Sequence, residues 1–152
     1  MEDRVQLAVS LFKEGYNCSQ AVVAAFADLY GIERDMALRI SASFGGGIGR
    51  MRMTCGAACG LFQLIGLETG ALDGADREGK SANYEAVQQV ARLFAQENGS
   101  LTCSELLGLA KNTSISSQAE ARTEAYYQKR PCAMMVESAA RIFAAYYKER
   151  HP

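Results

Sequence analysis

Four of the five cysteines stand where a helix is expected to begin. Each follows a residue that suits a helix start, because Asn and Thr cap helix N-termini and Pro favours the first turn. A helix N-terminus offers free N–H donors and a partial positive charge, which favour a thiolate over a thiol. The pattern therefore predicts a fold that gathers several helix starts around a group that requires sulfur anions. The four pairs are Asn17-Cys18, Thr54-Cys55, Thr102-Cys103 and Pro131-Cys132.

The fifth cysteine, Cys59, lies four positions after Cys55, so both occupy one face of a helix that begins near Thr54. Two sulfurs on one face could ligate a metal or take part in redox exchange, although this spacing is usually too wide for an unstrained disulfide. Free cysteine is also among the most buried residue types. We therefore expect Cys55 and Cys59 to be catalytic only if the chemistry is thiol–disulfide exchange; otherwise Cys59 is a small core residue.

A glycine-rich segment, residues 45–49, precedes Cys55. A dinucleotide fingerprint would need a preceding strand, and the segment before this one has a helical pattern, so nucleotide binding is not expected. Glycines let the backbone approach a bulky group and point N–H donors at it, and the sulfurs of a cluster accept such bonds. A plain turn is the alternative. Arg50 and Arg52 either offset thiolate charge or lie in solvent. The expected cofactor-binding glycines are Gly45, Gly46, Gly47 and Gly49.

Composition narrows the function classes. The 152 residues fit one domain, residues 1–152, and the net charge of −1 gives no reason to expect nucleic-acid binding. No run approaches the length of a membrane span, and the first residues lack a signal peptide's charge order, so we expect a cytoplasmic protein. In a reducing compartment, cysteines are more often thiols, metal ligands or redox groups than structural disulfides. The single histidine, His151, is expected to be disordered, and its isolation excludes a Cys-His dyad and a haem-attachment motif. The chain also has no C-x-x-C pair, so neither a thioredoxin motif nor a zinc ribbon is expected.

Apolar residues recur with helical spacing nearly throughout, and no run alternates long enough to predict a strand. We expect an all-α bundle of about six helices, with a loop at 70–79 and a polar stretch without apolar periodicity at 111–130. Two tyrosine pairs, 126–127 and 146–147, are expected to serve core packing or a homodimer seam. The expected helices, with uncertain ends, cover about 5–14, 18–30, 35–44, 54–69, 81–98 and 131–147, with a further short helix at 103–107.

Four segments together resemble one known family. They are NCSQAVVAAF around Cys18, FGGGIGR with CGAACG at Cys55, CSELLG at Cys103 and PCAMMVESAA at Cys132. In this order, across about residues 14–147, they are similar to the redox proteins named for a C_GCAxxG_C_C cysteine signature. The family label places Gly-Cys before Ala, whereas this chain has Cys55-Gly56-Ala57. We interpret this difference as a local variation in which Cys55 is the matching cysteine. Cys59 falls in the variable pair before Gly60 and is extra to the pattern.

The resemblance implies a helical protein with redox activity carried by its cysteines. A similar domain in split-Soret cytochromes is associated with an iron–sulfur centre beside haem, and only the cluster could apply here. The leading hypothesis is an iron–sulfur cluster, [2Fe–2S], that exchanges electrons with a donor and an acceptor that the sequence does not identify. The alternatives are thiol–disulfide exchange, a structural zinc site with four cysteine ligands, or a helical bundle with no cofactor. The expected metal ligands are Cys18, Cys55, Cys103 and Cys132.

Overall fold

The computed structural model describes residues 1–152 and confirms the all-α fold. Six helices have seven or more residues, and two are shorter. The only strand-like pairing is an isolated antiparallel bridge between Thr54 and Thr102. The α-helices are α1 (Glu2–Lys13), α2 (Cys18–Ala24), α3 (Arg34–Ser41), α4 (Gly56–Thr69), α5 (Arg77–Asn98), α6 (Cys103–Leu106), α7 (Glu124–Lys129) and α8 (Cys132–Arg150), with 3₁₀ turns at Ala27–Tyr30 and Ala42–Phe44.

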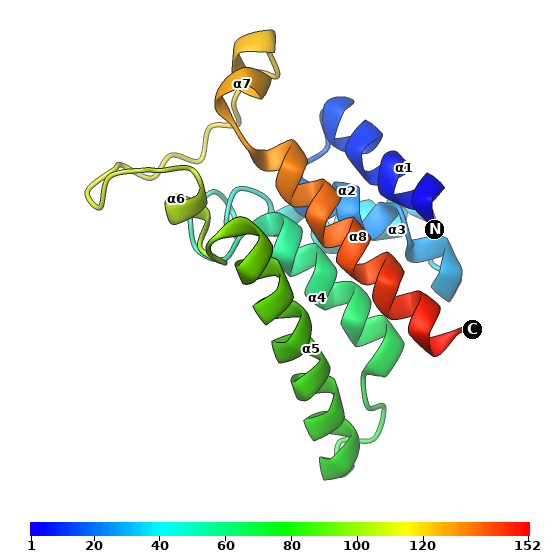
Figure 1. Cartoon of the computed structure of the whole chain (residues 1–152). Helices are drawn as coiled ribbons and strands as arrows, with labels where there is room; N and C mark the ends of the chain where they lie inside the picture. The colour runs from blue at the N-terminus through cyan, green and yellow to red at the C-terminus, as the bar shows by residue number, and fades with distance from the viewer.

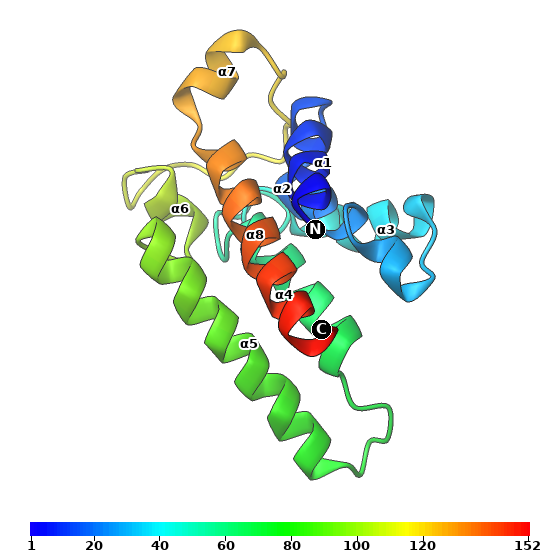
Figure 2. The same cartoon turned by 45° about the vertical axis from the view of Figure 1, so that its right-hand side comes forward.

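The two helices α4 and α8 form the centre of the bundle (Figures 1 and 2). They lie side by side in the same direction, and α5 runs antiparallel along both of them. Helix α1 packs on α8, while α2 packs on α1, α4 and α8. The starts of α4, α6 and α8 therefore lie toward one end of the bundle, and the C-terminus lies toward the other. No helix combines the length and the apolar character that crossing a membrane would need.

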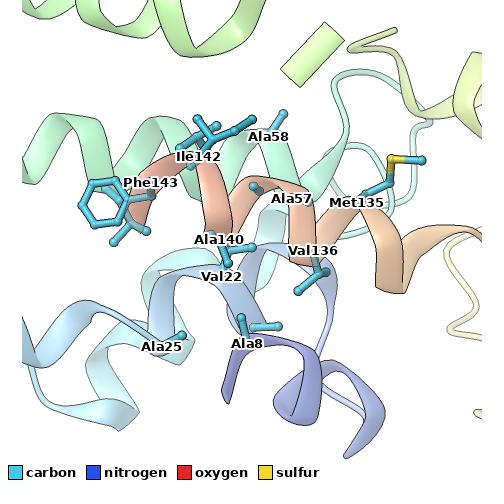
Figure 3. Close-up of a cluster of buried hydrophobic side chains, with 14 of the residues drawn as sticks. Ala8, Val22, Ala25, Ala57, Ala58, Met135, Val136, Ala140, Ile142 and Phe143 are labelled. Atoms are coloured by element: carbon cyan, nitrogen blue, oxygen red, sulfur yellow. The ribbon is translucent and has the colours of Figure 1, made fainter. Parts of the chain in front are cut away.

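Small residues at the start of α4 allow the helices to approach closely (Figure 3). Ala57 and Ala58 are fully buried, and a Cβ on Gly60 would lie 3.0 Å from the carbonyl oxygen of Ser19 in α2. Further along the core, the rings of Phe26 and Phe143 meet edge to face with centroids 4.9 Å apart. Burying such side chains contributes about 1.5–3 kcal/mol each. The core thus holds α2, α4 and α8 together. Cys18, Cys55 and Cys132 lie at the starts of these three helices.

Some helix boundaries differ from those expected. Helix α5 begins at Arg77 rather than near 81, because the Asp76 side chain accepts a hydrogen bond of 2.8 Å from the Gly79 amide and caps it there. The expected helix at 18–30 is interrupted after Ala24, where the chain continues as a 3₁₀ turn. Helix α7 lies inside the polar stretch at 111–130, where no helix was expected, and Thr123 caps its start.

The expectation of disorder at His151 is wrong. Its ring stacks on Tyr147 with centroids 4.1 Å apart, and its Nε2 lies 2.8 Å from the carboxylate of Glu68. The same carboxylate accepts hydrogen bonds from Tyr30 at 2.5 Å and from Arg150 at 3.0 Å. These contacts attach the end of α8 to α4 and to the 3₁₀ turn after α2.

Candidate functional site

Four cysteines from distant parts of the sequence line one cavity of about 450 Å³. The chain contains no disulfide, and all five cysteines are free. Cys18, Cys103 and Cys132 are the first residues of α2, α6 and α8, and Cys55 is the N-cap residue of α4. Cys59 lies one turn further along α4, outside the cavity lining, so it does not belong to this cluster.

A capping box holds the first of these cysteines in place. The Asn17 side chain accepts a hydrogen bond of 2.9 Å from the Gln20 amide, and the Gln20 side chain accepts one of 3.1 Å from the Asn17 amide. Asn17 also donates to the Ala42 carbonyl oxygen at 2.9 Å. These bonds fix the start of α2, and with it Cys18, against the segment that leads into the glycine loop.

A short backbone pairing joins the second and third cysteines. The amide of Cys55 donates to the Leu101 carbonyl at 2.7 Å, and the amide of Cys103 donates to the Met53 carbonyl at 2.6 Å. These bonds flank the isolated bridge between Thr54 and Thr102. The pairing brings the starts of α4 and α6 to the same wall of the cavity.

The glycine loop, residues 45–52, makes another wall and turns in the left-handed sense. Gly46, Gly47 and Gly49 have φ angles of 66°, 74° and 56°, and three larger residues share this conformation. Left-handed backbone costs roughly 1–2 kcal/mol for each residue with a side chain. A Cβ on Gly47 would lie 2.6 Å from the Cβ of Cys103, so the loop approaches the cysteines too closely for any other residue there. The larger residues are Ile48, Arg50 and Arg52, with φ angles of 66°, 61° and 60°.

The four glycines that the sequence singled out, Gly45, Gly46, Gly47 and Gly49, all line the cavity. Their position beside the sulfurs agrees with a backbone that approaches a bulky group. That they contact a cofactor stays a prediction.

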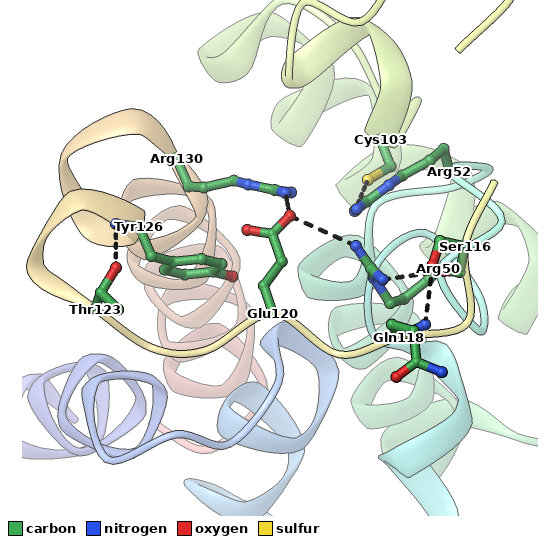
Figure 4. A network of polar contacts seen from close by, with 9 residues as sticks. All are labelled: Arg50, Arg52, Cys103, Ser116, Gln118, Glu120, Thr123, Tyr126 and Arg130. Atoms are coloured by element: carbon green, nitrogen blue, oxygen red, sulfur yellow. Dashed lines mark hydrogen bonds and ion pairs between the residues drawn. The ribbon is translucent and has the colours of Figure 1, made fainter. Parts of the chain in front are cut away.

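Arginines dominate the charge of the cavity lining, which contains four of them and one glutamate. Arg52 donates toward the sulfur of Cys103 at 3.9 Å, so it lies beside a thiol rather than in solvent (Figure 4). Arg122 donates to the carbonyls of Phe12 and Tyr16 at 2.8 and 2.9 Å. The other three charged side chains are Arg50, Arg130 and Glu120.

Cys132 is the most acidic of the thiols. The hydrogen bond from the Cys18 thiol to its sulfur lowers the pKa of Cys132 to about 7, against the opposing effect of burial, and the charges of Arg130, Arg122 and Arg52 act in the same direction as that bond. The same hydrogen bond, together with burial, raises the pKa of Cys18 well above its ordinary value. In this pair, Cys132 therefore ionises more readily, and Cys18 stays a protonated thiol.

The other thiols are held neutral. Burial raises the pKa of Cys55 to about 12, although the amides of Ala57 and Ala58 at the start of α4 donate to its sulfur and lower it. Burial also raises the pKa of Cys103 despite Arg52, and that of Cys59 to about 11. A helix start was expected to favour each thiolate. In the protein without a metal, burial outweighs that effect at Cys55 and Cys103.

Two observations bear on whether this set could hold a metal group. No group of three or more His, Cys, Asp or Glu side chains is positioned to hold a metal ion. Yet four cysteines, the donor set of an iron–sulfur cluster, surround one cavity, with arginines beside them. The chemistry of the donor set therefore fits a cluster, although the side chains as placed do not form a metal site. The assignment of Cys18, Cys55, Cys103 and Cys132 as metal ligands stays a prediction.

Several cavity residues were not identified from the sequence. Tyr126 was expected to serve core packing or a dimer seam rather than cofactor stacking, but it lines the cavity, where the Arg122 guanidinium lies 4.9 Å from its ring centroid. Glu120 and Arg122 come from residues 107–123, a segment without regular structure that follows α6 and that we call the strap. Arg130 precedes Pro131-Cys132 directly, and this adjacency was the one local signal that could have revealed it.

The comparisons with known proteins agree with the cysteine pattern. A family model described as "Putative redox-active protein (C_GCAxxG_C_C)" matches residues 16–146. The match includes all four cavity cysteines and all four cavity arginines. No curated protein and no solved structure matches the chain.

Proposed function

The chain belongs to the C_GCAxxG_C_C family of redox-active proteins, and we propose that its four cavity cysteines bind an iron–sulfur cluster, [2Fe–2S], for electron transfer. The observation that carries the proposal is the position of Cys18, Cys55, Cys103 and Cys132 around a single cavity. Each comes from a different helix start, so the set exists only in the folded chain. When bound, such a cluster supplies one-electron transfer.

The residues around the cysteines suit a negatively charged group. Four thiolates carry more charge than a buried site tolerates alone, and Arg52 and Arg122 lie where they offset it. The amides of Ala57 and Ala58 already donate to the sulfur of Cys55. The burial that keeps Cys55 and Cys103 protonated in the metal-free protein would then give way to ligation, since metal binding releases thiol protons.

Oxygen-free purification tests this proposal. We expect iron and acid-labile sulfide in equal amounts, with visible absorption and a reduced-state EPR signal. Replacing Cys18 and Cys132 together by serine should remove the iron, whereas Cys59→Ser should retain it because Cys59 lies outside the cavity. Full iron in the double variant would refute the ligand set, and zinc in place of iron and sulfide would favour a structural site instead.

A second candidate is thiol–disulfide exchange, which the contact between Cys18 and Cys132 favours. The Cys132 thiolate would attack a substrate disulfide and release one thiolate as a mixed disulfide forms. Cys18, after losing its proton, would attack the sulfur of Cys132 and release the second thiol. Two electrons thus pass from the protein dithiol to the substrate disulfide. Cys55 and Cys59 suit this role less well, because burial raises the pKa of both thiols to about 12 and 11.

Diamide oxidation of the metal-free protein tests the exchange mechanism. Under exchange chemistry, peptide mapping should recover a Cys18–Cys132 disulfide that dithiothreitol reverses, and the protein should reduce a small aromatic disulfide. If oxidation links other cysteines, or none, the exchange mechanism with this pair is wrong. The iron measurement is independent of this result.

A further inference from the structure

One carboxylate bridges two arginines on opposite walls of the cavity (Figure 4). An oxygen of Glu120 accepts a close hydrogen bond from Arg130 and lies 3.5 Å from a guanidinium nitrogen of Arg50. Arg50 extends from the glycine loop, and Arg130 directly precedes the start of α8. Glu120 belongs to the strap, so the carboxylate reaches the two arginines from a segment without regular structure.

The arginine charge exceeds what this carboxylate can balance. The side chains of Arg50 and Arg130 are only 21% and 18% exposed, and they share a single carboxylate that is itself 44% exposed. Arg52 and Arg122 also line the cavity, but their charges act on Cys103 and Cys132, so they do not balance Glu120 or take its place. The whole chain carries a net charge of −1, so this concentration of positive charge is local. Buried charges of one sign favour an anion of the opposite sign.

Backbone strain holds two of these arginines in place. Arg50 and Arg52 both have left-handed φ angles, 61° and 60°, which residues with a side chain rarely adopt. Hydrogen bonds keep this conformation, from the amide of Arg50 to the Gly45 carbonyl and from that of Arg52 to the Gly46 carbonyl, both at 3.2 Å. Strain of this kind concentrates where a side chain must be positioned for binding. Here it directs two guanidinium groups to the cavity that holds the thiols.

We infer that Arg50 and Arg130 form a recognition site for the carboxylate of a small-molecule ligand, and that Glu120 occupies this site when the ligand is absent. A cavity of about 450 Å³ is within the size range of small-molecule pockets. Two arginines that already hold one carboxylate have the geometry to hold another. The inference rests on the proposed function in one respect: the ligand is a redox substrate or an effector that binds in the same cavity.

Binding exchanges one carboxylate for another. The ligand's carboxylate takes over the hydrogen bonds of Arg50 and Arg130, and Glu120 moves outward into solvent, where its charge is hydrated. The strap moves with it and gives up the hydrogen bond that Ser116 accepts from Arg50 at 3.0 Å. The remainder of the ligand then lies beside Cys103 and Cys132, which line the same cavity.

Calorimetric titration of the full chain with glutarate tests the site, with the neutral diamide of glutarate as the matched probe. Glu120→Gln removes the internal competitor, so its dissociation constant for glutarate should be about fivefold or more below that of the unsubstituted protein. Glu124→Gln makes the same charge change on an exposed residue of α7 and should leave the constant unaltered. Equal affinities for Glu120→Gln and Glu124→Gln, or binding of the diamide as tight as that of glutarate, would overturn the inference.

A second comparison guards against misfolded variants. In the Glu120→Gln protein, Arg50→Gln should abolish glutarate binding and Arg50→Lys should restore part of it, whereas Arg92→Gln on the exposed side of α5 should have no effect. Glutarate bound equally by the Arg50→Gln and Arg92→Gln variants would assign the binding to another place. Iron content, measured on the same samples, reports on the cluster alone. Binding without iron would therefore reject the cluster and leave the anion site standing.

Discussion

The backbone amide of Cys103 donates a hydrogen bond of 2.6 Å to the carbonyl oxygen of Met53, directly after the glycine loop. The loop and the start of α6 are therefore one mechanical unit, although one lies before α4 and the other after α5. A change in the conformation of the loop next to Met53 would therefore also move Cys103. Substitutions at two of the loop glycines distinguish the effect of packing against Cys103 from the effect of backbone strain.

Gly47→Ala should lower the free energy of unfolding by about 2 kcal/mol or more, because it adds strain and a clash together. Its Cβ would lie 2.6 Å from the Cβ of Cys103. Gly49→Ala is the matched control, since Gly49 shares the left-handed conformation but has no neighbour nearer than 3.9 Å. It should cost only about 1 kcal/mol. Urea unfolding measures both, and equal losses would contradict the proposed contact between loop and cysteine.

Cys59→Ala should leave the iron content and the spectra of anaerobically purified protein unchanged. Cys59 is buried in α4, its sulfur lies 3.8 Å from the Thr54 carbonyl oxygen, and it is not part of the cavity lining. The loss of a small buried sulfur should cost about 1 kcal/mol of stability. If the variant loses iron as completely as a Cys55→Ala variant does, Cys59 is a ligand and the ligand set must be revised.

Alkylation should distinguish Cys132 from the other thiols in chelator-treated protein. Its pKa of about 7 means that half of the Cys132 side chains are thiolates near pH 7, so its iodoacetamide reaction should rise with a midpoint there. Cys55 and Cys59, with pKa values of about 12 and 11, should react slowly until the pH is far higher.

Cys18→Ala supplies the control for this measurement. It removes the hydrogen bond that is the largest cause of the lowered pKa, so the Cys132 midpoint should move upward. Peptide mapping by mass spectrometry follows each cysteine separately. An unchanged midpoint in the variant would show that the arginines alone make Cys132 acidic.

Glu68 should contribute stability that disappears in acid. Burial opposes its charged form, but hydrogen bonds from Tyr30, Arg150 and His151 outweigh burial and lower its pKa below the ordinary 4.5. A carboxyl with a lowered folded-state pKa stabilises the fold above its unfolded pKa, and this contribution is lost as the pH falls through the folded value. Glu68→Gln should therefore cost about 1.5–3 kcal/mol at pH 7 and much less below pH 4.

Unfolding by urea at several pH values measures this difference, with Glu149→Gln on the exposed face of α8 as control. A stability difference between the Glu68→Gln and Glu149→Gln proteins that stayed constant from pH 7 to pH 3 would exclude the ionised carboxylate as its cause.

The sequence predicted what local physics decides. The capping residue Asn17 placed a helix start at Cys18, and apolar spacing predicted the helices that form the core. Thr102 also precedes a helix start, at Cys103, but its side chain makes no capping hydrogen bond. Helix α7 was missed because its residues show no apolar stripe, and it forms through the Thr123 cap and the contacts of Tyr127 with α1. Such contacts exist only once the chain has folded.

The composition of the cavity could be predicted only in part for the same reason. The cysteines carry a recognisable pattern, but the hydrogen bond between Cys18 and Cys132 depends on the packing of α2 against α8. Glu120 and Arg122 lie in a polar stretch where charged residues are ordinary, and only the path of the strap brings them to the thiols. Arg50 could be suspected from its position, but its left-handed backbone could not.

The placement of cysteines at helix starts gives the molecule two unlike ends. Helix α8 alone extends for 19 residues, so Cys132 is separated from the C-terminal end of that helix by about 28 Å. Under the proposed electron transfer, a carrier protein would approach the end formed by the strap and the glycine loop. A fluorophore or an affinity tag joined after Pro152 would sit at the far end, where it leaves that approach open and can report on complex formation.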